Sequence, residues 1–456
     1  MNESPGVFVA APPSKSLSHR ALIAAALAGG QSLIENVLAS DDIERTRDCL
    51  SVAGARFERR GDGYLVYGVS GAPAGGSEQA VLIDVGESGT TCRLLTAVLA
   101  AGRGMFQIQG QGRMHDRPIG ELTRVLEGLG TTVRHLGKAG CPPLTLIASG
   151  LPGGRAVISM GESSQYLSGL LLASPMAAKE SLFEIGGGKA VSWPYVALTL
   201  DVMHDFGIGF TVERLGGGIW REIDFREPKE VVPGAVRFKV APGAYASRTY
   251  RVEGDWSNAS YLLAAGALGP SPVTVAGLRQ SSLQGDRAIV DILSAMGARV
   301  VFSREGAHDV VTVFPGELQG IDVDMGHCPD LVPTVAVLAS LARGVTHITN
   351  VAHLRIKESD RLSAMAGEIA KTGAQVEVLP EGLRIEAAAE PVTGQMTGRV
   401  TGSIEFTTYG DHRIPMSLSL FELAGIRPAF DNPACVAKSF PGFWGQWRKI
   451  VPVPPE

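Results

Sequence analysis

Glycines recur along this chain at a nearly constant interval, and that interval limits the folds that the sequence can adopt. A stretch rich in small residues ends in glycine or lysine and is followed by a short apolar run typical of a strand. The markers of this pattern lie 74, 75, 90, 75 and 81 residues apart, at Gly30, Gly104, Lys179, Gly269, Gly344 and Gly425. Regular self-similarity predicts repeated supersecondary units. We therefore expect six units, each with a helix, a strand, a second helix and a hairpin.

A second series of glycines has the same interval and alternates with the first. Its members follow helical stretches and lie 76, 77, 90 and 76 residues apart, at Gly54, Gly130, Gly207, Gly297 and Gly373. Both series lengthen to 90 residues at the junction of the third and fourth units. We interpret the longer step as the boundary between two α/β domains of three units each. A solenoid is the competing architecture, but solenoid repeats are usually shorter, at about 20–45 residues.

Composition narrows the classes of function. The chain has 456 residues, 45% of them hydrophobic, and a formal net charge of -5, so it offers no general basic surface for nucleic acid. Its five cysteines are scattered without metal-ligand spacing, which argues against a zinc site and fits a reducing compartment. No apolar run is long enough to cross a bilayer, and the first residues lack the pattern of a secretory signal. We expect a cytoplasmic protein without a membrane span.

A polar cluster precedes the small-residue helix of every unit. The clusters occupy residues 13–20, 86–93, 161–166, 254–258, 326–330 and 409–413. Ordinary N-capping explains their serines and aspartates, and it is the simpler interpretation of any single cluster. Capping does not explain Lys15, Arg20, Arg93 and Arg413, because cations oppose the helix dipole at an N-terminus. If each domain points its three helices at the other, the cleft between them suits an anionic ligand.

Residues 354–362 combine charged and hydroxyl side chains with the start of an apolar helical stripe. Ser359 or Asp360 is expected to cap this helix, and Lys357 and Arg361 would then share a face. Two cations at a helix start make sense if an anion binds there. The alternative interpretation is a solvated helix start with local ion pairs.

Other cations occupy unusual local contexts, before helices or beside proline. With the pair just named they form the set Lys15, Arg117, Lys357, Arg361, Arg413 and Lys438, and the carboxylates among them are Asp330, Glu358 and Asp411. Guanidinium groups match phosphate and carboxylate oxygens, and lysine adds a mobile charge. The residues alone therefore indicate a two-domain enzyme that performs acid–base chemistry on small polyanions without a metal.

Ten segments of the chain carry a resemblance to a known family. They are SKSLSHR (14–20), GESGTTCR (86–93), GRMHDRPIG (112–120), ESSQYLSGLL (162–171), WPYVALTL (193–200), VEGDWSNASYLLAA (252–265), LQGDR (283–287), LRIKESDRL (354–362), YGDHRIPM (409–416) and AKSFPGFW (437–444). From residue 13 to about residue 447 the chain resembles the 5-enolpyruvylshikimate-3-phosphate synthases, a family of enolpyruvyl transferases. The resemblance implies two domains, each with three repeats around a pseudo-threefold axis, joined by two crossover strands. It assigns residues 14–252 to an N-terminal domain on the shikimate 3-phosphate side. Residues 1–13 and 253–456 form the C-terminal domain with the acid–base and phosphate-clamp residues.

The resemblance also implies a reaction. The family transfers the enolpyruvyl group of phosphoenolpyruvate to the 5-hydroxyl of shikimate 3-phosphate, on the route to chorismate and the aromatic amino acids. Addition gives a tetrahedral ketal phosphate, and elimination then releases phosphate. No cofactor is needed, and we expect a monomer whose only partners are these two small molecules.

Residue roles follow from the matched motifs. Asp330 resembles the group that takes the hydroxyl proton, Glu358 resembles the acid–base at the methylene carbon, and Lys15 assists the leaving phosphate. The resemblance implies phosphoenolpyruvate contacts from Lys15, Gly89, Arg117, Gln165, Arg361, Arg413 and Lys438. It implies shikimate 3-phosphate contacts from Ser16, Arg20, Thr90, Ser163, Ser164, Gln165, Ser192, Tyr195, Asp330, His353 and Lys357.

The sequence departs from the family pattern at a few positions. Glu87, His353 and His19 stand where many members have asparagine, and His353 could weaken one contact to the shikimate ring. One alternative is the related transferase that acts on UDP-N-acetylglucosamine, which uses a loop cysteine as acid, and residues 110–117 contain no cysteine. The other alternative is an anion-binding protein without catalysis on the same scaffold.

Overall fold

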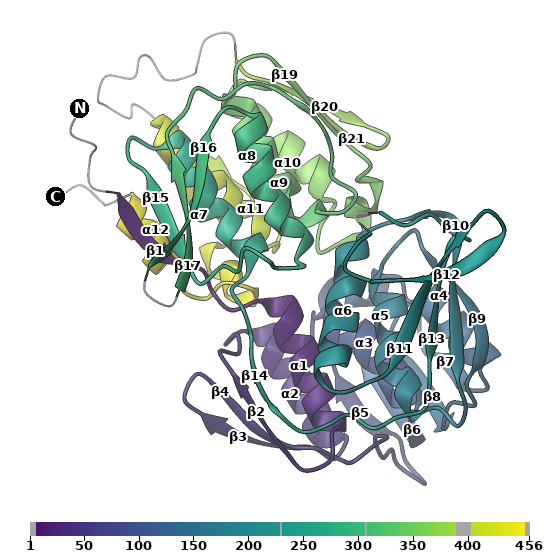
Figure 1. The fold of residues 1–456 in the computed structure, drawn as a ribbon. Helices are drawn as coiled ribbons and strands as arrows, with labels where there is room; N and C mark the ends of the chain where they lie inside the picture. The colour runs from purple at the N-terminus through teal and green to yellow at the C-terminus, as the bar shows by residue number, and fades with distance from the viewer. Residues whose placement is uncertain (1–5, 229, 306–307, 389–402, 452–456) are drawn as a thin grey trace. The chain divides into compact units, whose positions relative to one another are not determined.

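The computed structural model describes residues 6–228, 230–305, 308–388 and 403–451. The chain divides into two compact units, one of residues 13–252 and one of residues 1–12 together with residues 253–456 (Figure 1). The backbone therefore passes from one unit to the other twice. Pro13, which the resemblance assigned to the C-terminal half, groups with the residues that follow it.

The described part of residues 13–252 contains three sheets, and each includes one parallel pair followed by antiparallel strands. The first sheet has the order β14 (Thr249–Arg251), β2 (Gln31–Glu35), β4 (Gly63–Tyr67) and β3 (Arg56–Arg60). The second has the order β5 (Val81–Asp84), β6 (Arg103–Gln109), β8 (Leu144–Ser149) and β7 (Thr132–His135). The third has the order β9 (Gly154–Met160), β10 (Ser181–Ala190), β13 (Val236–Val240), β11 (Phe210–Gly216) and β12 (Ile219–Ile223).

The other unit repeats this arrangement within its described residues. One sheet has the order β1 (Val7–Ala10), β15 (Val273–Ala276), β17 (His308–Phe314) and β16 (Arg299–Glu305). A second has the order β18 (Asp322–Asp324), β19 (Val345–Thr349), β21 (Gly382–Glu386) and β20 (Gln375–Leu379). The third is the parallel pair β22 (Ser403–Phe406) and β23 (Arg427–Phe430).

Each parallel pair is joined to a buried helix that lies just before its inner strand in the chain. These helices are α1 (Lys15–Leu27), α3 (Gly89–Ala100), α5 (Gln165–Ala173), α7 (Trp256–Leu268), α9 (Val332–Leu341) and α11 (Arg413–Leu418). A second helix follows the inner strand: α2 (Asp41–Val52), α4 (Gly120–Gly128), α6 (Trp193–Asp205), α8 (Ile289–Ala295), α10 (Arg361–Ala370) and α12 (Phe443–Ile450). This recurrence is the pattern that the glycine intervals predict, while the pseudo-threefold axis stays a prediction.

The sixth unit departs from the predicted pattern of helix, strand, helix and hairpin. After β23 the described chain, which continues to residue 451, forms a 3-10 helix (η7, Pro433–Lys438) and α12, without a hairpin. Helix α12 is amphipathic, and it buries Phe443 and Trp447 in the core of its unit. The expectation of six identical units was therefore wrong at this position, because these residues pack as a helix on the core.

Small residues explain why the central helices are buried. Helix α1 buries every side chain from Leu17 to Leu27, and from Ala21 onward these are apolar on all faces of the helix. Helix α3 packs against both α1 and α5, and α9 packs against both α7 and α11. At Gly169 of α5 an added Cβ would lie 2.9 Å from the carbonyl oxygen of Arg93 in α3, so only glycine permits this approach. The close packing fixes where the first turns of these helices lie.

Capping residues set several helix starts. Ser14 accepts a hydrogen bond from the amide of Leu17, and Ser88 accepts one from the amide of Thr91. Asp360 caps α10 by accepting from the amide of Ser363 at 3.1 Å. Of the two caps expected for this helix, Asp360 is therefore the correct one.

Candidate active site

In the unit of residues 13–252, the first candidate residue along the chain lies at the start of α1. Lys15 is the first residue of α1, and its Nζ forms an ion pair with Asp42 in the first turn of α2. Both side chains are largely buried, so water screens this pair less than it would screen an exposed one. Asp42 is not recognisable as a site residue from the sequence, because nothing in a linear pattern links the two helix starts.

Arg20 is only 1% exposed and ties α1 to α6. Its Nε donates to Thr199 Oγ1 at 2.8 Å, its Nη1 to the carbonyl of Ser16 at 2.8 Å, and its Nη2 to the carbonyl of Tyr195 at 3.0 Å. Burial lowers the pKa of Arg20 to about 10, so it stays protonated at neutral pH. Arg20 thus holds the backbones of Ser16 and Tyr195, which are both predicted shikimate 3-phosphate contacts.

A chain of hydrogen bonds crosses from α3 to α5. Arg93 Nη1 donates to Gln165 Oε1 at 3.1 Å, and Gln165 Nε2 donates to Thr90 Oγ1 at 2.9 Å. The two bonds fix which way the Gln165 amide points. Gln165 and Thr90 were predicted from the sequence to be site residues. Arg93 was noted only as an unexplained cation, and its contact to Gln165 supplies the explanation.

Gly89, at the start of α3, faces the guanidinium of Arg117. An added Cβ at this position would lie 2.5 Å from both Cζ and Nη2 of Arg117. Arg117 also donates from Nη1 to the carbonyl of Glu87 at 3.4 Å. The absence of a side chain at Gly89 therefore makes room for this cation. The contacts of both residues with phosphoenolpyruvate stay predictions.

The remaining candidates of this unit lie at helix starts. Ser163 and Ser164 are buried just before α5, where Ser163 Oγ accepts from the amide of Gln165 at 3.2 Å. Ser192 precedes α6 with a φ of 57°, in the left-handed region that residues with a side chain rarely occupy. Strained backbone of this kind persists where the surroundings enforce it, and functional sites are where it gathers.

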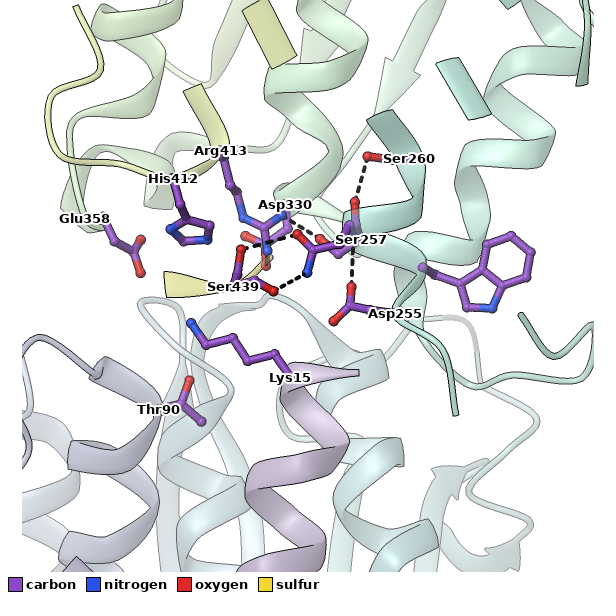
Figure 2. Close-up of polar contacts among 12 residues, drawn as sticks. Lys15, Thr90, Asp255, Ser257, Ser260, Asp330, Glu358, His412, Arg413 and Ser439 are labelled. Carbon is purple, nitrogen blue, oxygen red and sulfur yellow. Dashed lines mark hydrogen bonds and ion pairs between the residues drawn. The ribbon is translucent and has the colours of Figure 1, made fainter. Parts of the chain in front are cut away.

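In the other unit, an ion-pair network joins α10, α11 and the 3-10 turn η4 (Pro329–Leu331). Arg361 is 2% exposed, and its three nitrogens reach three carboxylates: Nε lies 2.8 Å from Asp411 Oδ2, Nη1 2.9 Å from Asp330 Oδ1 and Nη2 2.8 Å from Glu358 Oε2. Arg413 Nη2 holds the second oxygen of Asp330 at 2.7 Å (Figure 2). Four predicted site residues, Asp330, Glu358, Arg361 and Arg413, are therefore in direct contact.

The charges of this network favour its ionised form. Burial alone would raise the pKa of Asp330, but the guanidinium groups of Arg413 and Arg361 hold it well below its usual range. Lys357 acts in the same direction, which places its charge near Asp330. Burial opposes the charge on Arg361, yet Asp411, Glu358 and Asp330 raise its pKa above the ordinary value. A buried network of this kind is stable only while every member stays paired.

Asp411 was noted in the sequence as a carboxylate of the DHR segment but was not assigned to the site. It is fully buried, and Ser359 Oγ donates to its Oδ2 at 3.0 Å while the amide of Arg413 donates to its Oδ1 at 3.1 Å. Asp411 thus joins the start of α10 to the start of α11. Its position in the DHR segment was the only signal in the sequence that could have found it.

Three further predicted residues belong to the same unit. His353 is buried in the 3-10 helix η5 (Ala352–Ile356), Lys357 follows directly after it, and Lys438 ends η7. Their assigned roles stay predictions. Among the described residues, no three His, Cys, Asp or Glu side chains gather as a metal site. In the described part of the chain, no helix has the length and apolarity that a bilayer crossing requires.

The chain is similar to known proteins along nearly its whole length. Residues 7–219 and 229–447 match the family model of EPSP synthase (3-phosphoshikimate 1-carboxyvinyltransferase). A 3-phosphoshikimate 1-carboxyvinyltransferase of Shewanella amazonensis is 37% identical over 442 residues, which cover 96% of this chain and 95% of that protein. A protein of the same name from Syntrophobacter fumaroxidans is 39% identical over 444 residues, covering 96% of each.

Solved structures show the same fold. An EPSP synthase from Acinetobacter baumannii has a TM-score of 0.72 at 23% identity, covering 99% of this chain and 96% of that one. The enolpyruvyl transferase NikO from Streptomyces tendae has a TM-score of 0.69 at 18% identity, covering 98% and 95%. The two-domain α/β fold class predicted from the sequence is therefore confirmed. With the family model matched along nearly the whole chain, the protein belongs to the EPSP synthase family.

Proposed function

We propose that the protein transfers the enolpyruvyl group of phosphoenolpyruvate to the 5-hydroxyl of shikimate 3-phosphate and releases inorganic phosphate. Membership of the family and the names of relatives at 37–39% identity support this reaction. In the structure, the ion pairs of Asp330 carry the assignment. Arg361 and Arg413 each bind one oxygen of Asp330, and Glu358 pairs with the same Arg361. Two carboxylates and two guanidinium groups in contact provide acid–base groups beside anion-binding groups.

The proposed reaction has two steps. In the first, the 5-hydroxyl oxygen forms a bond to C2 of phosphoenolpyruvate, its proton passes to Asp330, and Glu358, which begins as the carboxylic acid, gives its proton to C3. In the second, the C2–O bond to phosphate breaks, Glu358 takes a proton back from C3, and the double bond forms again. The proton on Asp330 passes to the departing phosphate, which leaves as hydrogen phosphate, and Asp330 returns to its carboxylate form. Lys15 stabilises the charge on the departing phosphate. The predicted contacts with the two substrates remain as assigned from the resemblance.

The ion pairs of Asp330 explain how binding and proton transfer can be linked. A carboxylate with a strongly lowered pKa is a weak base, because a good general base has a pKa near the working pH. An anionic substrate that takes hydrogen bonds from Arg413 or Arg361 adds negative charge beside Asp330. Like charge nearby raises the pKa of a carboxyl group. Asp330 is therefore expected to become a stronger base when the anion is bound.

A phosphate-release assay with purified protein tests the proposal against its alternatives. Phosphoenolpyruvate is supplied with shikimate 3-phosphate, with UDP-N-acetylglucosamine, or alone. We expect release only in the first mixture. Release with the nucleotide sugar would identify the related transferase, and no release in any mixture would favour an anion-binding protein without catalysis.

We further propose that the protein acts as a cytoplasmic monomer on these two small molecules alone. All five cysteines are free thiols, which suits a reducing compartment: Cys49, Cys92, Cys141, Cys328 and Cys435. Light scattering on the purified protein measures the mass in solution, and a mass of twice the chain's 47.9 kDa would contradict the monomer.

A further inference from the structure

Helix α7 carries polar side chains in its first turn that have no role so far. Ser257 Oγ accepts a hydrogen bond from Arg413 Nη1 at 2.6 Å (Figure 2). Tyr261 OH accepts from the same nitrogen at 3.3 Å. Residues 257 and 261 are four apart, so they lie on one face of the helix. This face of α7 therefore fixes the guanidinium of Arg413.

The neighbouring residue, Asn258, contacts a different segment. Its Nδ2 donates to the carbonyl of Ser439 at 3.2 Å, and its Oδ1 accepts from Ser439 Oγ at 3.2 Å. Asn258 is 1% exposed and Ser439 is fully buried. The pair is 181 residues apart in the chain, and it joins the start of α7 to the residue directly after Lys438.

The backbone around Ser439 leaves it little freedom. Its amide donates to the carbonyl of Val436 at 3.1 Å, so its N–H, C=O and hydroxyl all have partners. Two of these three bonds depend on the single side chain of Asn258. The backbone amide of Asn258 donates to Asp255 Oδ1 at 2.8 Å, and this bond anchors the first turn of α7. A fixed Ser439 sets the direction in which the preceding residue projects.

We propose that Asn258 is a positioning residue that holds Lys438, through Ser439, at a set spacing from Arg413 for binding of the anionic enolpyruvyl donor. Consecutive residues of α7, Ser257 and Asn258, hold the two cations. This inference rests on the proposed function, because the resemblance is what assigns Lys438 and Arg413 to phosphoenolpyruvate.

Kinetics of three variants test the proposal. Asn258→Ala removes both bonds to Ser439, whereas Ser439→Ala removes only the bond from the hydroxyl. Loss of a buried pair of this kind predicts a KM for phosphoenolpyruvate about tenfold higher in Asn258→Ala, with a smaller rise in Ser439→Ala. The KM for shikimate 3-phosphate is expected to stay unchanged. The double variant is expected to match Asn258→Ala, because both substitutions break the same contact.

The control variant is Ser340→Ala, which removes a buried hydroxyl of α9 that donates to the carbonyl of Val337 at 2.8 Å. It should change neither KM, and urea unfolding shows how far each variant alters stability. The positioning role would be overturned if both KM values rose equally in Asn258→Ala, or if neither rose. Additive effects of the two substitutions on the KM for phosphoenolpyruvate in the double variant would also overturn it.

A second readout needs no turnover, so it separates this inference from the proposed function. Acetic anhydride labels lysine amines, and mass spectrometry follows the labelling rate of Lys438. We expect that rate to change several-fold in Asn258→Ala and to stay the same in Ser340→Ala. If the unaltered protein releases no phosphate, the proposed function fails while this measurement still decides the inference. An unchanged rate at Lys438 would overturn it.

Discussion

Replacement of Gly89 by alanine is the most direct test of how the anion-binding cations are placed. The new Cβ would lie 2.5 Å from Cζ and Nη2 of Arg117 and 2.7 Å from Nη1. Ordinary contact begins at 3.4 Å, so the guanidinium must retreat by about 0.9 Å, the difference between 3.4 and 2.5 Å. The guanidinium is the far end of a flexible side chain, so it moves while the helix stays in place.

The size of the effect follows from this displacement. Arg117 is 7% exposed, so its new position is confined by neighbouring atoms. A hydrogen bond to a charged group contributes about 1.5–3 kcal/mol, and an error of about 1 Å in position removes much of it. We therefore expect the KM for phosphoenolpyruvate to rise about 10- to 100-fold in Gly89→Ala. The KM for shikimate 3-phosphate should change little.

Steady-state phosphate release, with each substrate varied in turn, measures the two KM values. Gly128→Ala is a matched control in the same unit, because a Cβ at this last residue of α4 meets no atom within 4 Å. The control should behave as the unaltered protein. If Gly89→Ala leaves the KM for phosphoenolpyruvate unchanged, Arg117 does not contact this substrate and the argument from steric exclusion is refuted.

Three further predictions concern the network of Arg361. Asp330→Asn should lower kcat by about 10²- to 10⁴-fold while both substrates still bind in calorimetry, since it removes a general base, and an unchanged kcat would exclude Asp330 from proton transfer. Asp411→Asn removes a buried partner of Arg361 and should lower the free energy of unfolding in urea by about 3 kcal/mol. The exposed Asp322→Asn is its control, and equal losses in the two variants would contradict the account. The third prediction is a pH dependence: burial would raise the pKa of Asp330, but Arg413 and Arg361 lower it in the folded state. A lowered folded pKa stabilises the protein above the unfolded value of about 3.9 and ceases to do so as the pH falls through the folded pKa. The stability difference between the unaltered protein and Asp330→Asn should thus be constant from about pH 7 to 5 and shrink below about pH 4, and a gap that narrows near neutral pH would show that the pKa is not lowered.

The sequence predicted the features that depend on local rules. Glycine intervals reflect turns that end helices, so they predicted the recurring units, and β6 and β19 indeed follow their buried helices in the same way. Capping chemistry predicted Ser359 or Asp360 as the cap of α10, and Asp360 is the cap. The repeat pattern gave a wrong prediction in the sixth unit, where the amphipathic helix α12 packs in place of the expected hairpin.

Side-chain partners could not be predicted, because they depend on which distant segments the fold brings together. Arg20 and Thr199 are 179 residues apart, and Arg361 and Asp411 are 50 apart. The resemblance proposed the motif residues of the site. Asp42 gave no signal in the sequence, and Arg93 and Asn258 were assigned no role there, since each of the three acts through a neighbour. The same holds for strand pairing, because β14, at the end of residues 13–252, pairs in parallel with β2, near their start.

Phosphorus NMR of the purified protein with both substrates tests the central claim most directly, because it follows every phosphorylated species at once. The account predicts that the signals of phosphoenolpyruvate and shikimate 3-phosphate fall together while inorganic phosphate and one new phosphate monoester rise in equal amounts. The account would be contradicted if inorganic phosphate appeared without loss of shikimate 3-phosphate. It would also be contradicted if the signals of the two substrates never changed.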